Sequence, residues 1–542
     1  MISPEDIATH KIESTFAQWK ELALKSLKGK PLEKYLDVSS LEGISKSILF
    51  EHSDRAVDLL TYPDTQERVQ FYDLKKYSKD HFELDKELGI NKFIFQVQKE
   101  KIDLSYLPTQ NTHLHVQLSN DEFIKNYLGE DIAKNIAIDV NDLIFKDFSN
   151  EIDRVLKLNA KTKFLIDLSH VHNAGGSVVQ ELTYALCLYA RLLEKEISPS
   201  LIEFRVSTHS ELFLNIAKLK TLRYLAELIC EQAGSELNIT IHATNSLREQ
   251  TLYDPWNNIL RNCTSTLAQV MGGANSVSTR SYDYLFSKLT FEKPSLLAHR
   301  YAIQTLNILF EESNIEKTND PAKGAFYIEK LIENLASASW ESFLNWRERS
   351  FLENTKDFAI EVAAIGKQRR KEVRTRKKVI TGVNDYADPT QRIEDLYKKK
   401  WKPIEMQFGH FPLRRLAFEF ENLRINNELS EKKEKVVIIT RGKLAQINAR
   451  LNFIQNIFDT VALDYDVINE ADINEKIKND LNKYSAIVFC AIDDEYADFI
   501  STIEHPNKVI AGKVDSLKDK TQFLHMGMDV YSFVSQFIKE VE

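Results

Sequence analysis

Three histidines are the residues of this 542-residue chain whose type and position best suit chemistry. His170, His209 and His242 each stand where a short apolar run gives way to polar residues. An imidazole can donate, accept or transfer a proton near neutral pH, so all three are candidates for acid–base work or for holding a polar ligand. No general acid–base pair stands at a recognisable spacing, so we rank an enzyme that works with these histidines alone last.

The most informative stretch runs from residue 241 to 261. His242 ends an apolar run, a polar loop follows, and Asp254 and Pro255 open a helix that carries Asn258 in its first turn. Proline suits the first turn of a helix because its missing N–H needs no partner there. The pattern predicts a strand, a polar loop and a helix.

A second polar turn, residues 169–176, contains His170 and precedes another helical pattern. Unpaired backbone N–H groups at the start of such a helix can meet an anionic group. Two interpretations stay open: His170 shapes and packs the turn, or it keeps a contact with a ligand. His170 and His172 form a poor metal pair, and we expect no metal site in the chain.

Short apolar runs alternate with long helical patterns between about residues 90 and 350. The predicted strands are Lys92–Val97, His113–Leu118, Phe164–Leu168, Phe204–Ser207, Ile239–Ala243 and Asn275–Ser278. The predicted helices cover residues 176–194, 210–233, 255–271 and 297–313. This alternation requires a parallel sheet, and its length suits an α/β fold with a closed (β/α)8 barrel of the TIM type. The three histidines would then lie at strand ends, where the active site of a barrel lies.

The chain divides into four predicted parts. Residues 1–50 form a helical and extended segment that contacts a partner or the chain's own barrel, 51–365 form the barrel, 366–435 a linker region, and 436–542 a second domain. The second domain has the buried strands and amphipathic helix of a flavodoxin-like doubly wound sheet. The linker holds eight Lys or Arg within residues 367–378. Such a run indicates a solvated helix face, or a docking site for an acidic partner or phosphate groups.

Composition narrows the function classes. A net charge of −9 argues against a general nucleic-acid binder, and no segment reaches the roughly 18–20 uncharged apolar residues that span a membrane. The first residues contain no basic stretch followed by an apolar run, so we expect no secretion. Four widely spaced cysteines form no CxxC pair, which fits a reducing cytoplasm. Glycine is scarce, at 16 residues, which counts mildly against a cofactor cradle.

These motifs together resemble the barrel of adenosylcobalamin-dependent methylmalonyl-CoA mutases. The resemblance rests on residues 241–261, 169–176, 213–223 and 319–329 and on Glu42-Gly43-Ile44. It covers roughly residues 14–50, 165–350 and 375–425, and 436–535 as fold rather than motif. Two family motifs are missing. Residues 245–251 replace the catalytic Thr-Ser-Gly-Trp-Ser-Leu-Thr, and residues 51–58 replace the Arg-Gly-x-Tyr-Ala that supplies a tyrosine over the substrate.

The C-terminal domain departs further from the family. Its cobalamin-binding Asp-x-His-x-x-Gly is absent, and residues 436–504 contain no histidine. The domain keeps only Gly442, Gly512 and Gly527, although the family uses several glycine turns to accommodate the nucleotide tail of the cofactor. The resemblance therefore implies that this domain has lost its cobalamin site.

The resemblance implies the small supporting subunit of a methylmalonyl-CoA mutase. A large partner subunit would carry adenosylcobalamin and the active site in a heterodimer, and would interconvert (R)-methylmalonyl-CoA and succinyl-CoA by radical rearrangement. No catalytic, cofactor-binding or metal-binding residue is then expected here. The remnants of the substrate pocket would be His170, His209, His242 and Asn258. Two alternatives stay open: a subunit of a related acyl-CoA mutase, and a free-standing, non-catalytic scaffold or CoA-thioester-binding protein.

Overall fold

The computed structural model describes residues 16–28, 30–32, 38–46, 62–63, 65–73, 79–97, 112–117, 136–144, 147–158, 162–290, 295–397, 407–408, 411–514, 517 and 521–538. Residues 51–58, which replace the tyrosine motif of the family, lie outside this part of the chain.

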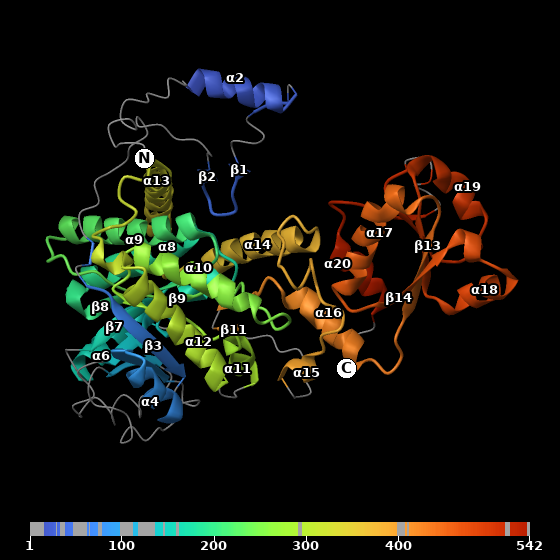
Figure 1. Ribbon diagram of the computed structural model, residues 1–542. Coiled ribbons are helices and arrows are strands. Elements are labelled where there is room, and N and C mark those ends of the chain that lie inside the picture. The colour runs from blue at the N-terminus through green and yellow to red at the C-terminus, as the bar shows by residue number, and fades with distance from the viewer. Residues whose placement is uncertain are drawn as a thin grey trace, which may run out of the picture.

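Eight parallel strands close into a barrel in the order β10-β3-β4-β5-β6-β7-β8-β9 (Figure 1). They are β3 Glu67–Asp73, β4 Lys92–Val97, β5 Thr112–Gln117, β6 Ile136–Asp139, β7 Lys163–Asp167, β8 Ile202–Thr208, β9 Thr240–Asn245 and β10 Ser276–Val277. The predicted TIM-type barrel is thereby confirmed. Neither β3 nor β6 is predicted from the sequence, because β3 has only a short apolar middle between charged ends and β6 has four residues.

Helices surround the barrel and follow its strands. They are α4 Lys79–Glu87, α6 Phe148–Leu158, α7 Ser169–Asn173, α8 Val178–Glu194, α9 Leu212–Gln232, α10 Asn257–Met271, α11 Tyr284–Thr290, α12 Leu296–Asn307 and α13 Phe326–Glu348. Ser177 and Gln180 form a reciprocal capping box at the start of α8. The four predicted helices correspond to α8, α9, α10 and α12, although the last ends at Asn307 and a π-helical turn follows it.

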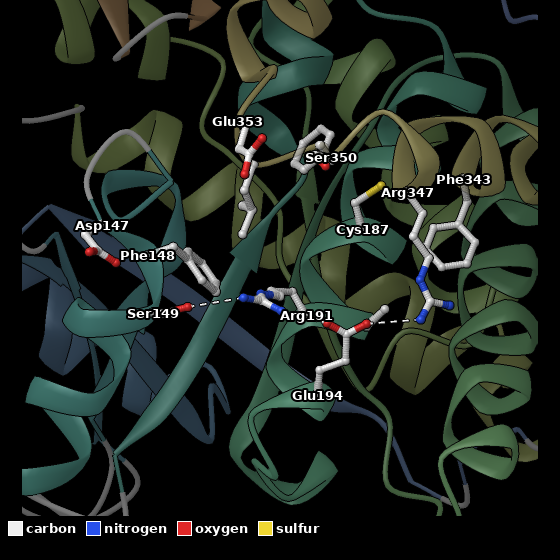
Figure 2. A pocket seen from close by; sticks show the side chains of 13 residues that line it. Asp147, Phe148, Ser149, Cys187, Arg191, Glu194, Phe343, Arg347, Ser350 and Glu353 are labelled. Atoms are coloured by element: carbon white, nitrogen blue, oxygen red, sulfur yellow. Dashed lines mark hydrogen bonds and ion pairs between the residues drawn. The ribbon is translucent and has the colours of Figure 1, made fainter.

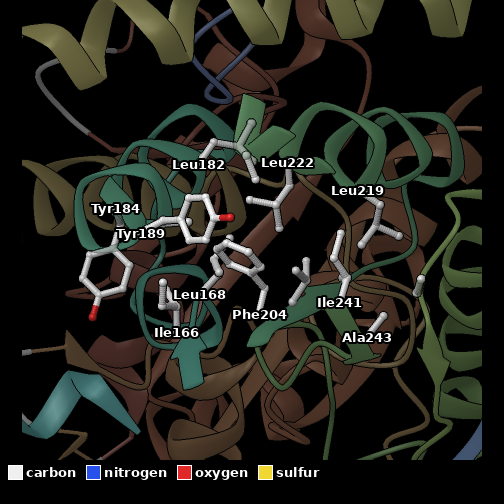
Figure 3. Packing of buried hydrophobic residues seen from close by; sticks show 14 of the residues in the cluster. Ile166, Leu168, Leu182, Tyr184, Tyr189, Phe204, Leu219, Leu222, Ile241 and Ala243 are labelled. Atoms are coloured by element: carbon white, nitrogen blue, oxygen red, sulfur yellow. The ribbon is translucent and has the colours of Figure 1, made fainter. Parts of the chain in front are cut away.

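The outward faces of the strands are apolar and pack against these helices (Figure 3). Phe204 on β8 contacts Tyr189 on α8, with ring centroids 5.2 Å apart. Ile241 on β9 and Leu222 on α9 belong to the same buried cluster. Full burial of one such side chain stabilises the fold by about 1.5–3 kcal/mol. Because side chains alternate along a strand, the other face of each strand points into the barrel.

Three helices occupy the region between the barrel and the second domain: α14 Thr355–Arg374, α15 Ile393–Tyr397 and α16 Phe418–Leu429, with a small hairpin of β11 Gln407–Phe408 and β12 Phe411–Pro412. The basic run forms the end of α14 and the turn after it. Arg374 donates twice to Glu419 at 2.7 Å, and Arg376 pairs with Asp385. Several of its charges therefore bind neighbouring segments of the same chain instead of facing solvent.

The second domain is a five-stranded parallel sheet in the order β14-β13-β15-β16-β17. Its elements are β13 Lys435–Thr440, α17 Leu444–Asp459, β14 Asp464–Asn469, α18 Glu475–Asp480, β15 Ala486–Cys490, α19 Tyr496–Ser501, β16 Lys508–Ala511, β17 Gln522–Leu524 and α20 Val530–Val534. Numbered along the chain, this order is 2-1-3-4-5, which is that of a flavodoxin-like fold, as predicted. Separate apolar clusters cover its two faces.

Near the N-terminus lie α2 Phe16–Ser26 and a hairpin of β1 Val38–Ser39 and β2 Ser45–Lys46. Within the described ranges, no helix combines the length and apolar character needed to cross a membrane.

Candidate functional site

The interior of the barrel is lined by charged and imidazole side chains. The inward-facing set comprises Lys92, His115, Asp139, Lys163, Asp167, Glu203, Arg205 and His242. Buried charges are costly unless they are paired and hydrogen-bonded. Here they form two clusters, which Arg205 connects by contacting Asp167 on one side and His115 on the other.

The floor cluster is centred on the carboxylate of Glu203. Lys163 Nζ lies 2.6 Å from Oε1, His242 Nε2 lies 3.1 Å from Oε2, and His115 Nε2 lies 3.7 Å from Oε2. The expectation that His242 ends its strand is wrong, because β9 continues to Asn245 and pairs with β8 as far as that residue. His242 is fully buried inside the barrel and does not reach a loop.

The charge states of the floor cluster follow from its burial and contacts. Burial raises the pKa of Glu203, but the neighbouring His242, His115 and Lys163 outweigh this effect and hold it well below its usual range. Burial lowers the pKa of His242, and lowers that of His115 to about 3. At neutral pH the cluster is therefore a carboxylate that accepts from Lys163 and from the neutral ring of His242, with the neutral ring of His115 3.7 Å away.

By distance alone, His115, Glu203 and His242 could hold a metal ion. Hydrogen bonding argues for a different arrangement. Arg205 donates to Nδ1 of His115, so the proton of the neutral ring lies on Nε2, the atom that faces Glu203.

The mouth cluster lies at the carboxyl ends of β6 and β7. His170 Nε2 lies 3.3 Å from Asp139 Oδ2 and 3.7 Å from Asp167 Oδ2. Burial lowers the pKa of His170, but the two carboxylates outweigh it, so the pKa is raised above its ordinary value. His170 was singled out from sequence. Asp139 was missed because β6 gives too short a signal, and Asp167 because it falls within an apolar run.

His209 lies beside a third buried network, built around His172. His172 Nδ1 is 2.7 Å from Glu181 Oε1, and Nε2 is 2.7 Å from the hydroxyl of Ser246. Lys218 Nζ donates to Glu181 Oε2 at 2.9 Å. The ring of His209 stacks on that of His172 with centroids 5.6 Å apart. Burial holds the pKa of both histidines well below the usual range, so both rings are neutral at pH 7.

The loop that replaces the catalytic motif is buried and fastened to the barrel mouth. Residues 246–252 are each less than a tenth exposed. Asn258 holds this loop: its Oδ1 accepts from the Thr251 N–H at 3.1 Å and from Arg261 at 2.8 Å, and its Nδ2 donates to the Thr251 carbonyl at 2.9 Å. Leu252 N–H donates to Glu421 of α16. The side-chain amide of Asn258 is therefore used in hydrogen bonds that hold this loop in place.

Arg248 joins this loop to the turn that carries His170. Its Nη1 donates to the carbonyls of His172 at 3.0 Å and Gly176 at 3.1 Å. Arg369 of α14 donates to the same Gly176 carbonyl and pairs with Glu42 at 2.8 Å. A cavity of about 200 Å³ lies among these residues and is also lined by His209. The cavity is small and its charges are paired internally.

A larger cavity of about 570 Å³ lies on the outside of the barrel, between α8 and α13 (Figure 2). In Figure 2, Arg191 contacts Ser149 and Glu194, and Arg347 contacts Glu194. Burial raises the pKa of the Cys187 thiol, which lines the same cavity, to about 12. None of the four predicted pocket residues lines this cavity.

The crevice at the carboxyl ends of β13 and β15 is where a doubly wound sheet binds its ligand. Here the loop after β13 places Arg441 against Glu470 and, at 2.8 Å, Asp498. Arg450 donates to the Ala491 carbonyl at 2.6 Å and pairs with Asp493 at 2.8 Å. These ion pairs, with no imidazole among them, do not fit a corrin that needs an axial histidine.

The chain is similar to known proteins over part of its length. The sequence profile of the family described as Methylmalonyl-CoA mutase matches residues 154–409. The methylmalonyl-CoA mutase small subunit of Porphyromonas gingivalis is 29% identical over 375 residues, which cover 64% of this chain and 57% of the relative. The small subunit of Streptomyces virginiae is 30% identical over 340 residues, covering 56% and 52%.

The matched region spans little more than half the length of these relatives. The Escherichia coli protein named methylmalonyl-CoA mutase, without a subunit designation, is 26% identical over 244 residues, covering 42% of this chain and 34% of the relative. The profile match covers the barrel from α6 onward and the region that follows it, and it ends before the second parallel sheet begins at Lys435. Residues 154–409 are therefore similar to the methylmalonyl-CoA mutase family.

Proposed function

We propose that this chain is the non-catalytic small subunit of an adenosylcobalamin-dependent methylmalonyl-CoA mutase. A large partner subunit holds the cofactor and the substrate, and together they form a cytoplasmic heterodimer. The holoenzyme interconverts (R)-methylmalonyl-CoA and succinyl-CoA by a radical rearrangement of the carbon skeleton. This chain contributes by stabilising its partner.

The observation that carries the proposal is the buried loop at the barrel mouth. A barrel that holds a thioester needs space and unpaired polar groups where its strands end. In this chain residues 246–252 lie in that position, Arg248 is 2% exposed, and its guanidinium is bound to carbonyls of the opposite turn. His170 and His209 are directed into internal contacts, and Asn258 holds the loop. The mouth is thus closed by its own side chains.

The C-terminal domain supports the same division of labour. Its crevice is filled by the ion pairs of Arg441 and Arg450. The residues present do not supply an axial ligand for cobalt, so we assign adenosylcobalamin to the partner. The names of the small-subunit relatives support a larger partner.

The test is mutase turnover and corrin absorbance, measured for this chain alone and after co-expression with a large subunit that contains the Asp-x-His-x-x-Gly motif. We expect neither corrin nor turnover from the isolated chain, and both from a one-to-one complex. Corrin bound stoichiometrically by the isolated chain would overturn the proposal. Turnover of other branched acyl-CoA thioesters by the complex is measured as well. If one of them is turned over faster than methylmalonyl-CoA, the complex is a related acyl-CoA mutase.

A further inference from the structure

The mouth cluster brings two carboxylates and one imidazole to a common point. Asp139 ends β6, Asp167 ends β7, and His170 lies in the first turn of α7. His170 Nε2 lies 3.3 Å from one Oδ2 atom and 3.7 Å from the other. The first distance equals, and the second exceeds by about 0.4 Å, the separation of about 3.3 Å between ligands of a tetrahedral zinc ion with bonds of about 2.0–2.1 Å. All three ligand atoms lie within 4.8 Å of one another.

The backbone holds both carboxylates in this orientation. Asp139 Oδ1 accepts from the Asn141 N–H at 3.0 Å, and Asp167 Oδ1 accepts from the Ser169 N–H at 2.9 Å. Each Oδ2 is thereby turned toward His170. Outer hydrogen bonds that fix the first ligands are typical of protein metal sites, because they remove the cost of ordering the ligands on binding.

The charge of the cluster leaves a place for a cation. Arg205 donates to Asp167 Oδ2 at 3.0 Å and balances one carboxylate. The Asp139 carboxylate, 3.3 Å from His170 Nε2, is the second negative charge at this point. The side chains of Asp139, Asp167 and His170 keep 6, 5 and 11% of their exposure. These side chains thus keep a small exposed area, in contrast to the fully buried His242 of the floor cluster.

We propose that Asp139, Asp167 and His170 bind one Zn²⁺ ion at the barrel mouth. The ion takes the place of the His170 proton, which leaves to solvent, and it joins the ends of β6 and β7 to α7. No metal site was expected from the sequence; Asp139, Asp167 and His170 come from separate elements with no motif spacing. The site is independent of the proposed function, since it lies wholly within this chain.

The test is calorimetric titration of the tag-free full-length chain with Zn²⁺, supported by the visible absorption of Co²⁺ as a spectroscopic substitute. We expect one equivalent to bind, with about one proton released, measured by repeating the titration in buffers of different ionisation enthalpy. Affinity should increase by up to about tenfold per pH unit, because the proton and the metal compete for Nε2. The groups that face this nitrogen are Asp139, Asp167 and Arg205.

Asp139→Asn and His170→Gln should each weaken Zn²⁺ binding by at least about tenfold, in line with the loss of one ligand. Asp85→Asn is the matched control: Asp85 is also buried and lies 2.6 Å from His299, but it belongs to neither candidate metal group. It should leave affinity unchanged. Thermal unfolding of each variant shows whether it is folded. If a variant is not folded, the titration of the wild type alone decides whether the chain binds Zn²⁺. Binding equal in wild type and Asp139→Asn, or no binding to wild type at 100 µM Zn²⁺ (on the order of the weakest specific sites), overturns the proposal.

Discussion

His242 is of a residue type that suits catalysis, but its position in the fold does not suit a catalytic role. The sequence makes it a candidate remnant of a substrate pocket, whereas in the structure it is fully buried and donates to Glu203 inside the barrel. We expect this imidazole to act in stability alone.

His242→Ala should leave turnover of the assembled holoenzyme within about threefold of wild type, which corresponds to less than 1 kcal/mol of barrier. The free energy of unfolding should fall by about 1–3 kcal/mol, because Glu203 loses a buried hydrogen bond. Turnover of the complex and urea unfolding of the isolated variant measure the two effects. A hundredfold loss of turnover in a complex of normal stoichiometry would show that His242 reaches the reaction.

At this scale the sequence predicted His170 and His209 as residues at strand ends, and the structure places them there. Their partners were not predictable in the same way. Asp139 and Arg205 are separated from His170 by more than 30 residues along the chain, and only strand pairing through β6, β7 and β8 brings them together. Spacing along one strand or helix carries no information on such a cluster.

The strands and turns of the barrel bury several histidines in the neutral form. Burial lowers the pKa of His115, His172, His209 and His242 below the ordinary value of about 6.5. The unfolded chain therefore binds more protons than the folded chain below that pH. His170, held by Asp139 and Asp167, has a raised pKa and acts in the opposite direction.

Stability should accordingly fall as pH decreases from 6.5 to 5, with each of the four histidines contributing up to about 1.4 kcal/mol per pH unit. Urea unfolding at several pH values, with EDTA present, measures the slope. His209→Gln should flatten it, because one neutral ring no longer has to be protonated. In contrast, His170→Gln should remove stability that is complete below pH 6.5 and is lost at higher pH. A wild-type stability that is flat over this range would contradict the assignment of neutral rings.

Prediction from sequence succeeded for elements with strong periodicity and failed for short or interrupted ones. α8, α9 and α10 have long apolar stripes and were found within a few residues. β3 has charged residues at both ends and Gln70 within its apolar middle, and β6 has four residues, so neither gives a long apolar run. The linker region predicted at 366–435 contains ordered helices, because its basic side chains bind acidic partners that lie elsewhere in the chain.

For the molecule as a whole, α14 is the element that connects the barrel mouth to the second domain. At its middle Gly366 lies against the turn before α8, where Gly175 adopts a φ of +101°. A Cβ built on Gly366 would lie 2.7 Å from the Ala174 carbonyl oxygen, and one built on Gly175 would lie 2.5 Å from the Gly366 Cα. The two backbones approach so closely that neither position accepts a side chain. The closed mouth and the junction between domains are thus one packed unit.

Gly366→Ala tests this packing, because two effects predict opposite changes in the free energy of unfolding. In an ordinary helix interior the change stabilises by about 0.5–1 kcal/mol. Here the methyl group meets backbone, which cannot rotate away, so we expect a net loss of about 1–3 kcal/mol. Ala363→Gly, at an exposed position on the same helix, provides the control and should cost only the helix propensity. Urea unfolding of both variants gives the comparison. If Gly366→Ala stabilises the chain, α14 does not pack on the turn, and the buried loop at the mouth loses the support that keeps substrate out.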